Sequence, residues 1–238
     1  MATSGLAPCG IRPWTLSALR SVSCRGRIVD TSASRNRVSN RYRRPIMKYG
    51  SSFAQFRAGA GNVWQEYVSH RFVTGMGDGT LPRAAFLYYL KQDYVFLIHF
   101  SRAWALAVTK ADTVDEMRAC TATLNALINE ELKLHIELCG REGIDEATLF
   151  ATQEAPQNLV YTRYVLDAGY SGDFLDMLAA LAPCVLGYGE IGASLGASAT
   201  SDIYSEWINA YSSSEYQDVC GEFGVLMDNA IHSRLGTT

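Results

Sequence analysis

The sequence contains few residues that interrupt helices or build disulfide frameworks. Only six of its 238 residues are proline, and four of these precede residue 83, so the rest of the chain can form long helices. The six cysteines, at positions 9, 24, 120, 139, 184 and 220, include no CxxC pair. This usage predicts reduced thiols in a cytosol-like compartment rather than a disulfide framework or a zinc site.

Long hydrophobic runs are also missing. A helix that crosses a bilayer needs about 20 consecutive apolar residues. The stretch over 86–109 comes nearest, but Lys91, Asp93, His99 and Arg102 interrupt it. We therefore expect no membrane partner.

Basic charge is scarce outside the first 48 residues. Those residues carry nine arginines and one lysine against one acidic residue, a net charge of +9. The remainder carries 11 basic and 23 acidic residues, a net charge of −12. An acidic body disfavours nucleic acid as the main partner.

Residues 1–46 are rich in arginine and serine and show no sustained hydrophobic period. Three interpretations remain open: an over-extended start with the true beginning at Met47, a transit-like peptide, or a disordered basic arm. The first predicts a cytoplasmic protein, and the second predicts an organellar one.

From residue 47 to 238 the hydrophobic pattern is helical almost throughout, and strand alternation of useful length is missing. Thr113 and Glu116 have the spacing of a capping box at the start of a helix. We predict one all-α domain of about seven to nine helices. The expected helices cover 52–72, 82–111, 113–143, 145–151, 156–169, 172–198, 201–213 and 214–235, with a turn at 75–82.

Several polar residues occupy positions where apolar ones are expected. Asp93 lies among aromatic residues in YYLKQDYVFLIHF, where it either faces solvent, pairs with an arginine or anchors a nitrogen-rich ligand. Pro183 interrupts the most apolar segment and is expected to loosen the helix beside Cys184. Cys184 is then either a small buried residue or a thiol presented to a cavity. Tyr188 shares its helix face, whereas Glu190 points elsewhere and is expected to be structural.

Glu131 and His135 have the i, i+4 spacing that can bind iron or manganese in a helical bundle. Such a site needs a matching set on a second helix, and Asp93 with His99 does not supply one convincingly. We therefore favour a solvated helical face for this pair.

Four segments together resemble one known family. GDGTLPRAAFLYYLKQDYVFLIHFSRA, EELKLHIELCG, YTRYVLDAGYSGDFLDMLAALAPCVLGYGEIG and YSEWINAYSSSEYQ are similar, in order and spacing, to the TenA family of thiaminase II or aminopyrimidine aminohydrolases. The resemblance covers residues 51 to 222. It implies a haem-oxygenase-like helical bundle that carries no cofactor and forms a homotetramer.

The resemblance also implies an activity and a set of site residues. The reaction is hydrolysis of 4-amino-5-aminomethyl-2-methylpyrimidine, or of thiamine, to the hydroxymethylpyrimidine used in thiamine salvage. Cys184 resembles the nucleophile, and Asp93 resembles the carboxylate that holds the ring. Tyr161, Tyr188 and Tyr211 resemble tyrosines that bond the substrate or the carboxylate network.

The chain departs from the family pattern at two places. Phe96 stands where many relatives have a tyrosine, and the resemblance implies that Phe96 is a pocket residue. The family also ends in a further helix with a general-acid glutamate, and this sequence stops at HSRLGTT. Two alternatives to the hydrolase therefore remain: a non-catalytic pyrimidine-binding protein, and a di-metal oxidase that uses Glu131 and His135.

Overall fold

The computed structural model describes residues 49–236, which form helices and connecting turns without a strand. The proposed basic extension over 1–46 lies outside these residues. The helices are α2 (Ser51–Ala60), α3 (Asn62–Val68), α4 (Arg71–Asp78), α5 (Arg83–Lys110), α6 (Val114–Ala126), η1 (Leu127–Glu131, a π-helix), α7 (Leu132–Arg141), α8 (Glu146–Phe150), α9 (Pro156–Ser171), α10 (Phe174–Ser198), α11 (Ser205–Ser212) and α12 (Ser214–Leu235). The predicted all-α class is confirmed.

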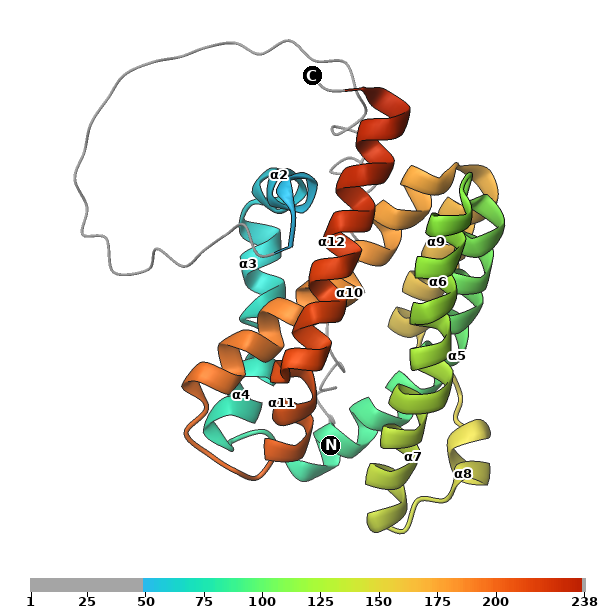
Figure 1. The fold of residues 1–238 in the computed structure, drawn as a ribbon. Coiled ribbons are helices and arrows are strands. Elements are labelled where there is room, and N and C mark those ends of the chain that lie inside the picture. The colour runs from blue at the N-terminus through green and yellow to red at the C-terminus, as the bar shows by residue number, and fades with distance from the viewer. Residues whose placement is uncertain (1–48, 237–238) are drawn as a thin grey trace, which may run out of the picture.

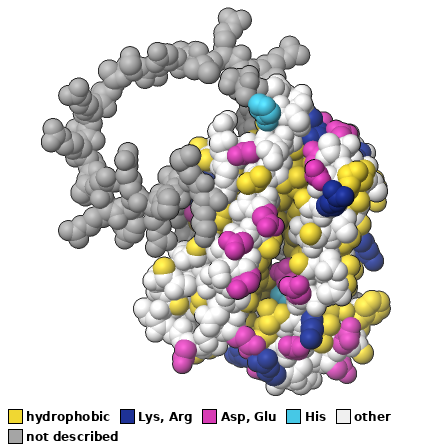
Figure 2. Space-filling view, viewed as in Figure 1, with side chains coloured by type: hydrophobic (Ala, Val, Ile, Leu, Met, Phe, Trp, Pro, Cys, Tyr) yellow, Lys and Arg dark blue, Asp and Glu magenta, His cyan; other side chains and the backbone are white. Residues whose placement is uncertain are grey.

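Two long helices organise the bundle. α5 packs against α6, α7 and α9, and α10 packs against α9, α11 and α12 (Figure 1). Hydrophobic side chains gather along the seam between α12 and the α6–α7 side (Figure 2). Of the helices in the described range, α10 alone is long and apolar enough to cross a membrane, with a mean hydropathy of 1.4. About two thirds (67%) of the apolar stretch of α10 is buried, which is typical of a core helix. The segment nearest to a membrane span is thus α10 and not the expected 86–109.

Several predicted boundaries were wrong. The helix expected over 52–72 is divided at Gly61, where φ is +53°, and again at His70. α4 then extends through Gly75 and Gly77 to Asp78, so the turn is shorter than expected. α5 begins at Arg83 with Pro82 as N-cap, and in the preceding turn the Thr80 hydroxyl donates to Asp78.

The segment expected as one helix over 113–143 contains a π-helical turn. α6 begins at the predicted capping box, in which Thr113 and Glu116 each bond the other's backbone. The chain then widens into η1 over Leu127–Glu131 before α7. Single π turns inside longer helices occur frequently at functional sites.

Buried apolar residues form two clusters. One contains Cys184, Tyr161 and Trp104, and the other contains Tyr89, Trp207 and Tyr211. Tyr67, Val68, Leu132 and Tyr216 pack against both clusters. The polar residues described next lie where the two clusters meet.

Candidate active site

A cavity of about 70 Å³ opens between α5, α9 and α10. A cavity needs about 10–15 Å³ to hold one water, so this cavity has room for several waters or a small ring. The lining residues are Tyr89, Gln92, Asp93, Phe96, Ala155, Gln157, Asn158, Tyr161, Cys184 and Tyr188. Four of the five predicted site residues, and Phe96, thus lie around one space.

Cys184 presents its thiol to this cavity from the middle of α10. Its side chain is 6% exposed, and Sγ lies 3.1 Å from the Tyr161 hydroxyl, to which it donates. Burial, and then the charge of Cys184, raise the pKa of Tyr161 well above its usual value. The phenol therefore keeps its proton and can donate it to a thiolate.

The helix continues through Pro183 rather than ending there. The carbonyl of Ala180 accepts the Tyr161 hydroxyl at 3.2 Å, and the carbonyl of Pro183 accepts the Tyr67 hydroxyl at 3.1 Å. Proline cannot donate the regular helical bond, so carbonyl groups near it need other partners. The two tyrosines thus satisfy backbone carbonyls in the turn that precedes the cysteine.

Phe96 forms an apolar wall of the cavity. Its ring stacks on Tyr161, with centroids 6.0 Å apart and planes at 19°, and on Phe100, with centroids 5.0 Å apart. Phe96 has no hydroxyl to offer the thiol, so in this chain the phenol bonded to Cys184 is that of Tyr161. A flat apolar wall beside a thiol suits a heteroaromatic ligand.

Asp93 is buried (7% exposed) and does not face solvent, and within residues 49–236 its ion-pair partner is His135, not an arginine. Its Oδ2 accepts the Tyr89 hydroxyl at 2.7 Å and lies 2.8 Å from His135 Nε2. Burial, and then the charge of Asp93, raise the pKa of Tyr89 well above its usual value. Tyr89 thus remains a donor to the carboxylate.

The preferred interpretation of Glu131 and His135 as a solvated face was wrong. His135 is fully buried (0% exposed) and bonds Asp93, while Glu131 accepts the Tyr211 hydroxyl at 2.7 Å. Burial raises the pKa of Glu131, although His135 and the Tyr211 bond act in the opposite direction. Within residues 49–236, no group of three or more His, Cys, Asp and Glu side chains could hold a metal ion.

The other predicted tyrosines differ in position. Tyr188 lines the cavity, and its hydroxyl lies 3.4 Å from that of Tyr89. Tyr211 is not a lining residue; it reaches the site through Glu131 and packs on Trp207 with centroids 4.3 Å apart. A side chain on Gly192 would meet the Tyr211 backbone at 2.2 Å, so this glycine permits the close approach of α11 to α10.

Glu190 is structural, as expected. It accepts Arg57 Nε at 2.8 Å and Trp64 Nε1 at 2.9 Å. Burial by itself would raise the pKa of Glu190, but these two bonds outweigh burial and the pKa is lowered. The carboxylate closest in sequence to Cys184 therefore holds α2 and α3 against α10.

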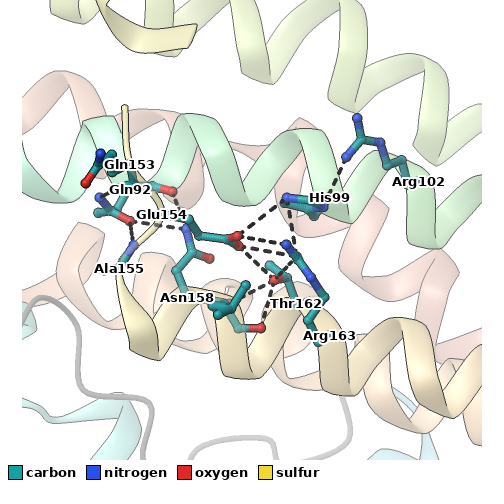
Figure 3. A network of polar contacts seen from close by, with 10 residues as sticks. Gln92, His99, Arg102, Gln153, Glu154, Ala155, Asn158, Thr162 and Arg163 are labelled. Carbon is teal, nitrogen blue, oxygen red and sulfur yellow. Dashed lines mark hydrogen bonds and ion pairs between the residues drawn. The ribbon is translucent and has the colours of Figure 1, made fainter. Parts of the chain in front are cut away.

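A second polar network holds the edge of the cavity (Figure 3). Gln92 on α5 donates to the Gln153 carbonyl at 2.9 Å and accepts from Ala155 N at 2.8 Å. Asn158 Nδ2 donates to the Gln92 carbonyl at 2.8 Å. Beyond them, Glu154 bonds Thr162 and Arg163, and His99 lies between Arg102 and Arg163.

Sequence reasoning missed Tyr89, Gln92, Asn158 and Trp207, and it misplaced His135. The i, i+4 spacing of Tyr89 and Asp93 was an available signal, because such pairs share a helix face. Nothing in the local pattern predicts the bond from Trp207 Nε1 to Tyr89 at 3.3 Å, which joins positions 118 apart.

Comparison with known proteins identifies the family. The model of the TENA/THI-4/PQQC family matches residues 58–233. This chain belongs to that family. The haem-oxygenase-like helical fold predicted from the resemblance is confirmed.

Three proteins illustrate how similar the members are. A TenA family transcription regulator from Silicibacter sp. TM1040 has a solved structure with 57% identity and a TM-score of 0.79, covering 80% of this chain and 84% of that one. An uncharacterized protein of Haemophilus influenzae is 41% identical over 67% of this chain and 75% of its own length. The aminopyrimidine aminohydrolase of Halalkalibacterium halodurans is 38% identical over 70% of this chain and 75% of its own length.

Proposed function

We propose that this chain hydrolyses 4-amino-5-aminomethyl-2-methylpyrimidine to 4-amino-5-hydroxymethyl-2-methylpyrimidine and ammonia, in thiamine salvage, and also acts on thiamine. The observation that carries the proposal is the placing of Cys184, Tyr161 and Asp93 around one cavity with a flat aromatic wall. The name of the relative from H. halodurans supports the same reaction.

The first step uses the thiol. The Cys184 thiolate adds to a ring carbon, which breaks the aromaticity and moves an electron pair onto a ring nitrogen. Tyr161 is placed to hold the sulfur by a hydrogen bond, and Phe96 packs against the Tyr161 ring. Asp93 accepts an N–H of the ring system and holds the ring in position for attack by the thiolate.

The second step exchanges the substituent. The electron pair returns through the ring to the exocyclic methylene, and the C–N bond breaks so that the protonated amine leaves as ammonia. Water adds to the methylene carbon and loses a proton. The C–S bond then breaks, which restores the aromatic ring and the Cys184 thiolate.

Ammonia release by the purified chain, measured with wild type and Cys184→Ala, tests the proposal. We expect turnover in wild type and a loss of at least a thousandfold in the variant, because the other described residues that line the cavity offer no thiol. Binding of the pyrimidine, measured by calorimetry, should persist in Cys184→Ala. Cys139→Ala, a buried cysteine outside the lining of the cavity, is the matched control and should keep its turnover.

A folded wild type that binds the pyrimidine without releasing ammonia would instead identify a non-catalytic binding protein. Equal activity in Cys184→Ala would exclude the covalent route.

We further propose that the active form is a homotetramer, as the resemblance implies, and that it is cytoplasmic, as the cysteine usage predicts. Light scattering coupled to size exclusion tests the assembly, and imaging of the full chain tests the location. A monomer at micromolar concentration, or an organellar signal that depends on residues 1–46, would contradict the respective part.

A further inference from the structure

His135 lies behind Asp93 and does not line the cavity. Its Nε2 and the Tyr89 hydroxyl both contact the same oxygen, Oδ2, at 2.8 and 2.7 Å. The ring is 0% exposed, so it cannot touch a ligand in the cavity. Any effect of His135 on the reaction must pass through Asp93.

The hydrogen bonds around this pair determine where the protons lie. His135 Nδ1 is 2.9 Å from the backbone carbonyl of Glu131, which only accepts, so Nδ1 carries a proton. Trp207 Nε1 can only donate, and it lies 3.3 Å from the Tyr89 hydroxyl oxygen, which therefore accepts from it. The proton of the Tyr89 hydroxyl is donated to Asp93. Oδ2 of an ionised Asp93 accepts both the Tyr89 hydroxyl and the Nε2 proton, and in this arrangement the ring is an imidazolium.

The surrounding charges favour the same state. Burial alone lowers the pKa of His135, but the bond and charge of Asp93 and the charge of Glu131 outweigh it, and the pKa is raised. The titratable groups that bond this pair or its immediate neighbours are Asp93 and Tyr89 on α5, Glu131 in η1, Tyr188 on α10 and Tyr211 on α11. All of these are acids, and Asp93 and Glu131 are the two that stabilise the cation.

We infer that His135 is a positioning residue that, as an imidazolium, fixes Asp93 through Oδ2 and leaves Oδ1 as its single acceptor for the substrate. Within residues 49–236 no side chain or backbone group bonds Oδ1, and Asp93 lines the cavity. One fixed acceptor oxygen selects a ligand with an N–H at that point, such as the exocyclic amino group of an aminopyrimidine. The inference rests on the proposed function for the identity of that ligand.

The charge of the ring is tested without any substrate. The chain has four histidines, so selective ¹⁵N-histidine labelling gives a small set of ring signals, and His135→Gln identifies the one that belongs to His135. We expect both ring nitrogens to carry protons at pH 7 in wild type, and Asp93→Asn to remove one of them. A neutral ring in wild type at pH 7 would overturn the inference.

The positioning role is tested by kinetics. We expect His135→Phe to lower kcat/KM about tenfold to a hundredfold, since it removes a charge-assisted hydrogen bond to Asp93. His135→Gln, which keeps an N–H donor, should recover much of this loss. Wild-type kcat/KM should fall at alkaline pH as the imidazolium loses its proton, and this decline should be missing in His135→Gln.

His232→Gln, at an exposed position near the end of α12, is the control and should match wild type. The inference fails if folded His135→Phe keeps wild-type kcat/KM, or if the alkaline decline is the same in His135→Gln. If wild type itself shows no turnover, the proposed function fails, and the ring signals alone then decide whether the ion pair exists.

Discussion

One fully buried and one partly buried histidine of this protein lie beside carboxylates, yet their surroundings shift their pKa values in opposite directions. His135 faces Asp93 and Glu131 and has a raised pKa. His99 lies 3.8 Å from Glu154 but between Arg102 and Arg163; burial, and then the charge of Arg163, lower its pKa. Burial lowers the pKa of both rings, and only at His135 do neighbouring carboxylates outweigh it.

The two regions also differ in exposure. The side chains of the Asp93–His135 pair are 7% and 0% exposed, whereas Arg163 in the outer network is 46% exposed. Water and salt screen the outer network more strongly than they screen the inner pair. The outer network is therefore suited to holding the segment before α9, and the inner pair to setting a charge at the cavity.

Removing the carboxylate from each region should give the largest contrast. Asp93→Ala leaves His135 without its main partner, so we expect a loss of about 3–5 kcal/mol in the free energy of unfolding. Turnover should fall by roughly a hundredfold to a thousandfold. Glu154→Ala should cost only about 1 kcal/mol. Urea unfolding with ammonia assays checks both, and equal losses would remove the distinction between the regions.

The pH dependence of stability gives a smaller but more specific contrast. Because the pKa of His135 is raised in the folded state, its stabilisation is complete below the unfolded pKa of about 6.5. That stabilisation is lost as pH rises through the folded pKa. For His99, whose folded pKa is lowered, stability is complete above about 6.5 and is lost as pH falls below it.

Urea unfolding of His135→Gln and His99→Gln between pH 5 and 9 tests these opposite signs. The difference between wild type and His135→Gln should shrink toward alkaline pH. The difference between wild type and His99→Gln should shrink toward acid pH. Parallel profiles for the two variants would show that both rings are in the same charge state.

The smallest effect is expected at Phe96, which lies on α5 midway between Asp93 and His99. Phe96→Tyr adds a hydroxyl to the wall that stacks on Tyr161, and we expect kcat to change by less than about tenfold. Phe96→Leu, which removes the ring, controls for lost packing. The ring signals of both histidines should stay unchanged; a shift at either one would show that the wall couples the two regions.

Sequence reasoning recovered the features that are local or repeated along the chain. Helical periodicity located α5, α9, α10 and α12, and the capping-box spacing located the start of α6. The resemblance predicted a shared site for Cys184, Asp93, Tyr161 and Tyr188. In the structure all four line one cavity.

What sequence could not supply are contacts between distant elements. Glu131 and His135 have the same spacing whether they face water or the core. Their burial follows from α5, 42 positions earlier at Asp93, and from α11, 80 positions later at Tyr211. The local sequence pattern likewise does not predict the π turn before His135, because its periodicity is that of one continuous helix.

The cap of α2 has a consequence for how the chain is made. Gly50 precedes α2 and offers no side chain, so the first amides of this helix, Ser51 N and Ser52 N, bond the carboxylate of Asp228, each at 2.8 Å. That carboxylate lies on α12, 177 positions from Ser51. On the ribosome, at about 5–20 residues per second, the start of α2 thus waits roughly ten seconds or longer for its cap. The earliest helix in the described part of the chain is among the last to be completed during translation.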